Sequence, residues 1–147
     1  MVSIETTVLS IHDAPRETIW TRLLPERGNG PGILLLADPE MKKTTLTQRA
    51  VLFAEEGYVV MMRQDVTGQD DISAGAHALE GLPETTTGIV CVAHGNAGVL
   101  AIQAAAAFSA IVIFDAPGAV AKVSELANLP CPVIFQFGIK GSDDASD

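Results

Sequence analysis

Five short apolar runs recur along the chain, and they are the feature that most constrains its fold. Uninterrupted runs of this length, bounded by turn residues, are typical of strands buried on both faces of a parallel sheet. Helical patterns separate them, so the alternation predicts an α/β fold with three layers, a mostly parallel sheet and helices on both faces. The predicted strands are 33–37, 58–62, 88–93, 110–114 and 131–137, and the predicted helices are 44–55, 70–80, 97–107 and 119–127.

Two further strands are predicted at the start of the chain. Residues 5–11 and 17–24 have strand patterns and are joined by a turn at 13–15, which indicates an antiparallel hairpin at one edge of the sheet. The segment 28–32, Gly-Asn-Gly-Pro-Gly, reads as a strong break after this hairpin. The polar end of the chain, 138–147, is expected to fray.

Composition predicts one domain over residues 1–147 and excludes several partners. The chain has 147 residues, of which 48% are hydrophobic, enough for a single core but not for two. Its 18 acidic against 9 basic residues give a formal net charge of -9. Nucleic acids and anionic membrane surfaces both attract basic patches, so neither is an expected partner.

The cysteines indicate a reducing compartment. Cys91 and Cys131 each lie within an apolar run, so buried free thiols are expected, as in the cytoplasm. The sequence contains no CxxC, HExxH, GxGxxG or Walker A motif, so neither a metal nor a cofactor is expected. No signal-peptide pattern opens the sequence, and no apolar stretch is long enough to span a membrane.

Candidate site residues follow the strands. Sites in open α/β sheets lie beyond the carboxyl ends of the strands. The segments to inspect there are 37–40, 63–65, 93–98, 115–118 and 138–144. From them we predict a small-molecule pocket formed by Asp38, Pro39, Glu40, His94, Gly95, Asn96 and Asp115.

The segment 93–98, Ala-His-Gly-Asn-Ala-Gly, is the most informative of these. It follows a predicted strand and opens a predicted helix, and the small residues Ala93, Ala97 and Gly98 would permit a sharp turn with close helix–strand packing. This is the pattern of a nucleophile elbow. The segment resembles the G-H-S-x-G-G or G-x-C-x-G-G elbow of the α/β-hydrolase superfamily, with Gly95 at the nucleophile position.

Three other segments resemble the dienelactone hydrolases of that superfamily. Residues 31–40, PGILLLADPE, are similar to the strand and oxyanion loop, and residues 53–68 resemble the family's helix–strand segment around G-Y-x-V-x-x-P-D. Residues 131–144 are similar to the strand that ends in the triad acid. The resemblance covers nearly the whole chain in the family's order. It implies a shortened α/β-hydrolase fold and activity on ester or lactone bonds.

The departures from the family point away from catalysis. Gly95 has no side chain, so covalent catalysis from that position is excluded. The resemblance places the triad acid at Asp143 or Asp144, but the histidines, at positions 12, 77 and 94, all precede it. A Ser-His-Asp relay in the family's order therefore cannot be built. The family's last strand and closing helix are not matched, which would expose apolar surface that a homodimer could cover.

Three functions remain open. The preferred one is a degenerate, non-catalytic hydrolase-like domain with a small-molecule pocket or an assembly role. The second is an active small-ester or lactone hydrolase in which His94 and Asp38 activate water. The third is a flavodoxin-like binding or signalling module, in which Asp38 and Lys140 imitate a receiver's acid and lysine.

Each candidate also has a purely structural interpretation. His94 could be a helix-start residue bonded to backbone, and Asn96 a cap that accepts backbone N–H groups. Gly95 could serve only the turn conformation. Asp38, Glu40, Asp65 and Asp115 could be solvated loop residues, and Cys91 a core residue.

Overall fold

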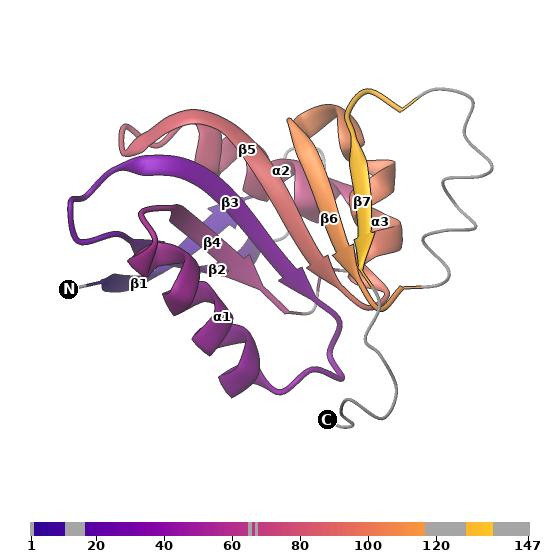
Figure 1. Cartoon of the computed structure of the whole chain (residues 1–147), viewed down its shortest axis with the longest axis horizontal. Helices are drawn as coiled ribbons and strands as arrows, with labels where there is room; N and C mark the ends of the chain where they lie inside the picture. Colours follow the sequence, from indigo (N-terminus) through magenta and orange to yellow (C-terminus); the bar gives the residue numbers. More distant parts are fainter. Residues whose placement is uncertain (1, 11–16, 65, 67, 117–128, 137–147) are drawn as a thin grey trace.

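The computed structural model describes residues 2–10, 17–64, 66, 68–116 and 129–136. Within them, seven strands form one sheet in the order β1-β2-β4-β3-β5-β6-β7 (Figure 1). The strands are β1 (Ser3–Ser10), β2 (Glu17–Leu24), β3 (Gly30–Ala37), β4 (Val59–Arg63), β5 (Thr85–His94), β6 (Ala110–Phe114) and β7 (Val133–Gln136). The helices are α1 (Lys43–Glu55), α2 (Gln69–Glu80) and α3 (Ala97–Gln103), and a 3₁₀ turn, η1, covers Ala105–Ala107.

The sheet is mostly parallel, as predicted. Strands β4, β3, β5, β6 and β7 run parallel to one another, while β1 pairs antiparallel with β2 and β2 antiparallel with β4. The order of the parallel strands alone would also suit a flavodoxin-like domain. The antiparallel pair does not belong to that fold, so the flavodoxin-like alternative loses its structural basis.

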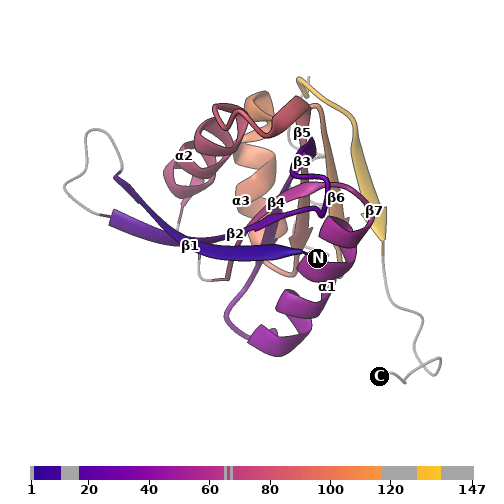
Figure 2. The same ribbon diagram turned by 90° about the vertical axis from the view of Figure 1, so that its left-hand side faces the viewer.

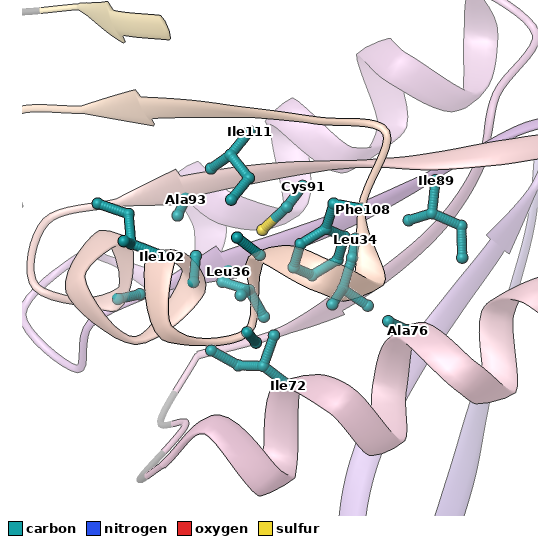
Figure 3. Close-up of a cluster of buried hydrophobic side chains, with 14 of the residues drawn as sticks. Leu34, Leu36, Ile72, Ala76, Ile89, Cys91, Ala93, Ile102, Phe108 and Ile111 are labelled. Atoms are coloured by element: carbon teal, nitrogen blue, oxygen red, sulfur yellow. The ribbon is translucent and has the colours of Figure 1, made fainter. Parts of the chain in front are cut away.

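Helices cover both faces of the sheet, which confirms the three-layer prediction. Helix α1 lies on one face, and α2 and α3 lie on the other (Figure 2). The central strand β3 divides its side chains between them: Leu34 and Leu36 belong to the core beneath α2 and α3 (Figure 3), and Leu35 and Ala37 to the core beneath α1. This two-sided burial explains why the sequence of β3 is continuously apolar rather than alternating.

The predicted break at 28–32 is wrong in its second half. A turn does precede β3, with Gly28 at φ 84°, but the strand itself begins at Gly30. A Cβ atom on Gly30 would lie 1.8 Å from the carbonyl oxygen of Gly57. The glycine therefore permits a close backbone contact inside the fold, a role that local sequence patterns do not distinguish from a turn.

Other boundaries differ by a few residues. Strand β5 begins at Thr85, three residues earlier than predicted, and the alanine-rich helix predicted to reach 107 leaves regular α-helix after Gln103. The predicted turn at 13–15, the helix at 119–127 and the tail at 138–147 lie outside the described residues.

Both cysteines are buried free thiols, as predicted. Burial raises the pKa of the Cys91 thiol well above its usual range, which suits a core residue and not a nucleophile. No helix among the described residues is both long and apolar enough to cross a bilayer.

The packing of α2 on the sheet depends on a glycine. A Cβ atom on Gly75 would lie 2.5 Å from two ring carbons of the buried Trp20. We expect Gly75→Ala to lower the free energy of unfolding by about 1–3 kcal/mol, because overpacking outweighs the better helix propensity of alanine. Chemical denaturation of the parent and the variant measures this change in the free energy of unfolding. Gly81→Ala at the end of the same helix is the control, because its nearest contact would be an ordinary 3.4 Å. Equal stability of the two variants would contradict the prediction.

Candidate functional site

The register of three parallel strands brings the candidate residues together. Ala37 of β3, His94 of β5 and Phe114 of β6 are direct neighbours across the sheet. The residues that follow them, Asp38, Gly95 and Asp115, therefore leave the sheet at the same level on its carboxyl edge. The sequence predicted each of these residues separately as a residue that follows a strand. The strand register shows that they follow neighbouring strands at the same level.

The elbow predicted at 93–98 has the expected backbone. Gly95 follows directly on β5 with φ 66°, and its N–H donates to the carbonyl oxygen of Phe114 at 2.9 Å. Helix α3 begins two residues later, and the N–H of Gly98 donates to the Gly95 carbonyl at 3.0 Å. A Cβ atom on Gly98 would lie 2.5 Å from Cγ2 of Ile113. The small residues thus permit the close approach of helix to sheet that their pattern predicted.

The Asp38 carboxylate fills the space above Gly95. A Cβ atom built on Gly95 would lie 2.0 Å from Asp38 Oδ2 and 2.8 Å from its Cγ. The backbone N–H of Asn96 donates to Oδ2 and that of Glu40 donates to Oδ1, both at 3.2 Å. The carboxylate therefore stands where the side chain of a nucleophile would begin.

Asn96 is not the side-chain cap that was considered for it. Its backbone is already helical, with φ -65° and ψ -16°, and its exposed side chain makes no cap hydrogen bond. A capping residue usually has extended dihedrals that aim its side chain back at the first helical N–H groups. Asn96 instead takes part in the site through its backbone N–H.

A glutamine holds the loop that carries Asp38. The side-chain amide nitrogen of Gln64, just after β4, donates to the carbonyl oxygen of Met41 and lies 3.3 Å from that of Asp38. It lies 3.4 Å from the carbonyl oxygen of Pro39. Gln64 thereby ties the loop after β3 to the end of β4.

His94 lies beneath the elbow and is only 5% exposed. Its ring stacks on Phe114 with centroids 4.8 Å apart, and its Nε2 lies 3.5 Å from Nη1 of Arg49 on α1, at the outer limit of a hydrogen bond. Burial and the Arg49 charge lower the pKa of His94 to about 4, while Asp115 and Asp38 act in the opposite direction. The imidazole is therefore neutral at pH 7.

The remaining predicted residues lie at the rim. Asp115 is exposed, has a positive φ of 55° and donates its N–H to the Gln136 carbonyl at 2.8 Å. Pro39 and Glu40 are exposed in the loop after β3. In the described parts of the chain, no three His, Cys, Asp or Glu side chains gather as a metal site would need.

Two open pockets adjoin this edge, and sequence reasoning missed most of their residues. One, of about 390 Å³, lies on the α1 side and is lined by Arg49, Leu52, Phe53, Glu56, Val92, His94 and Phe114. The other, of about 350 Å³, is lined by Ile19, Thr21, Pro39, Lys43, Leu46, Met62, Arg63 and Gln64. The helical spacing of Arg49, Leu52, Phe53 and Glu56 was the available signal for the first pocket.

The steric conflict between Asp38 and position 95 can be measured by a double-mutant cycle. We expect Gly95→Ala to destabilise the protein, because alanine would adopt a positive φ and its Cβ would displace the Asp38 carboxylate. Asp38→Ala removes the second cost. The double variant should therefore lose less stability than the sum of the single variants, by about 0.5–3 kcal/mol in chemical denaturation. Strict additivity would show that the two residues do not compete for space.

The buried His94 should make stability depend on pH. Its pKa of about 4 in the folded state lies below the ordinary histidine value of 6.5, so the unfolded chain binds the proton more tightly. The contribution of neutral His94 to the free energy of unfolding is complete above pH 6.5 and is lost as the pH falls toward 4. Between pH 6.5 and 5 the free energy of unfolding should fall by about 2 kcal/mol for this reason. Urea denaturation at both pH values should show a smaller loss for His94→Phe than for the parent. His77→Gln, at an exposed position, should behave like the parent.

Comparisons with known proteins identify the fold. No protein-family model and no curated protein matches the chain. The esterase domain of a Rhodothermus marinus protein superposes with a TM-score of 0.65 at 17% identity, covering 78% of this chain and 53% of that one. A protein named m3DLH gives a TM-score of 0.73 at 15% identity, covering 93% and 69%.

A third solved structure carries the name of the fold. The alpha/beta hydrolase GrgF from Penicillium sp. sh18 gives a TM-score of 0.63 at 14% identity, covering 78% of this chain and 46% of that one. The chain thus spans about half the length of GrgF and of the Rhodothermus esterase domain. Together with the strand order and the elbow, these similarities show that the chain has the α/β-hydrolase fold.

Proposed function

We propose that this chain is a non-catalytic α/β-hydrolase-like domain that uses its strand-end region for binding or assembly instead of hydrolysis. The observation that carries the proposal is the Asp38 carboxylate, which occupies the space above Gly95 and accepts the N–H of Asn96. Position 95 offers no nucleophile, and the side chain of Asp38 occupies the space that a nucleophile would need.

The position of Asp38 also opposes the second requirement of acyl transfer. In the α/β-hydrolases the oxyanion is held by the N–H of the residue after the nucleophile and by an N–H from the loop after the third strand. Here the first corresponds to Asn96, and the loop offers Pro39, which has no N–H, and Glu40. The N–H groups of Asn96 and Glu40 both donate to the Asp38 carboxylate. A fixed negative charge there would repel a developing oxyanion.

His94 is poorly suited to act as a base. It is buried, its Nε2 lies next to Arg49, and its pKa of about 4 leaves it a weak proton acceptor at neutral pH. A general base works best when its pKa lies near the working pH and it can reach the reacting proton. These properties support binding over catalysis.

The alternative is a hydrolase with a rebuilt site, in which His94 and Asp38 activate water. It has one observation in its favour: the charges of Asp115 and Asp38 both raise the pKa of His94, so the three groups lie close enough to interact. Burial and Arg49 outweigh them.

The assembly role is supported by the edge of the sheet. In the part of the chain that the structure describes, β7 pairs only with β6, and its Ile134 is 50% exposed. A second copy pairing at this strand would bury an apolar side chain and backbone groups that have no partner among the described residues. The homodimer and the cytoplasmic location both stay predictions.

Ester hydrolysis tests the proposal. Purified protein is assayed with a panel of small activated esters and lactones beside His94→Ala, Gly95→Ser and the double variant Asp38→Ala/Gly95→Ser. We expect no turnover above buffer from the parent, because position 95 carries no nucleophile and the N–H groups of Asn96 and Glu40 already donate to Asp38. Circular dichroism establishes that each variant is folded, and an active esterase checks the substrates.

Turnover by the parent that disappears in His94→Ala would overturn the proposal and establish the rebuilt hydrolase. Turnover that appears only in the double variant would support it, because it would show that Gly95 and Asp38 together block an otherwise competent frame.

A further inference from the structure

The pocket that contains Arg49 lies between α1 and the sheet, and residues of β5 and β6, among them His94, form its sheet side. Its volume of about 390 Å³ is in the usual range for small-molecule sites. Four of its lining residues are apolar: Leu52, Phe53, Val92 and Phe114.

Helix α1 presents one of its faces to this pocket. Arg49, Leu52 and Phe53 of α1 and Glu56, which directly follows the helix, are spaced three, one and three residues apart, so they lie on one side of the helix. Leu52 is 61% exposed. A ligand between Leu52 and Phe114 would cover apolar surface that now faces solvent.

The two ends of this face carry opposite charges. Arg49 lies at the end nearest the elbow, where its Nη1 is 3.5 Å from Nε2 of the buried His94. Across the described residues, no carboxylate pairs with Arg49. Glu56 follows seven residues later, about 10 Å along the helix axis. An anionic group would therefore be attracted to the Arg49 end and repelled from the Glu56 end.

We propose that this pocket binds a small organic carboxylate with a planar apolar body. The carboxylate would pair with the Arg49 guanidinium, whose fork of N–H donors matches its two oxygens. The body would lie against Leu52 and Phe53, and the stacked rings of His94 and Phe114 would supply a flat surface. The inference rests on the proposed binding role and adds the site and the ligand class.

The overall charge of -9 does not exclude such a ligand. Exposed charges farther away than about 8 Å are largely screened at physiological ionic strength, so the charges near His94 decide the local attraction. Among these, the Arg49 guanidinium attracts an anion, whereas Asp115 and Asp38 oppose it. Arginine also keeps its charge at every working pH.

Proton NMR of His94 tests the proposal. In the variant His12→Gln/His77→Gln, His94 is the sole imidazole, and its Hε1 resonance reports on the pocket. We expect benzoate to shift this resonance with a saturating titration curve. Benzamide, the neutral isostere, should bind at least about tenfold more weakly than benzoate. Arg49→Gln should abolish the preference for benzoate. Arg27→Gln is the matched control, because Arg27 lies in the turn before β3, where its Nε donates to the Asn29 carbonyl.

Equal affinity for benzoate and benzamide, no shift up to millimolar benzoate, or an unchanged preference in Arg49→Gln would each overturn the proposal. The proposal would also be overturned if sedimentation showed a dimer and dimer formation made the His94 resonance insensitive to benzoate. In that case a second copy of the chain would occupy the pocket. If the parent neither binds benzoate nor hydrolyses esters, this inference alone is overturned. If the parent hydrolyses esters and His94→Ala does not, the proposed function is overturned.

Discussion

The burial of β3 on both faces is the constraint on which the rest of the structure depends. Its odd and even side chains enter two different cores, beneath α1 and beneath α2 and α3, so neither layer can shift without disturbing the other. Its hydrogen bonds fix β4 on one side and β5 on the other. Its register with β5 sets Ala37 opposite His94, and this places Asp38 above Gly95.

The elbow keeps the backbone of a nucleophile turn although position 95 is a glycine. The backbone at Gly95 has the positive φ of a strained turn, which costs a glycine little. The missing side chain leaves space, and Asp38 fills it with a carboxylate that satisfies the N–H groups of Asn96 and Glu40. An oxyanion site and a carboxylate-binding turn need the same donors, so one can replace the other without a change of backbone.

His94 and Arg49 connect the elbow to the pocket behind it. The imidazole is buried and neutral, stacks on Phe114 and is approached by the guanidinium from α1. The sequence analysis considered His94 and Asp38 as a pair that activates water, but the ring of His94 contacts Phe114 of β6 and Arg49 of α1. The same residue therefore supports both proposals, the non-catalytic role and the ligand site between α1 and the sheet.

The sequence by itself determined the strand–helix alternation, the hairpin, the buried cysteines and the elbow, because these follow from local hydrophobic periodicity and small-residue spacing. Only the tertiary structure decided that Gly30 begins a strand, that Asn96 acts through its backbone, and that Arg49 lies beside His94. The last contact joins residues 45 positions apart, and the Asp38–Asn96 bond joins residues 58 apart. Such contacts depend on strand register and helix placement, which no local pattern encodes.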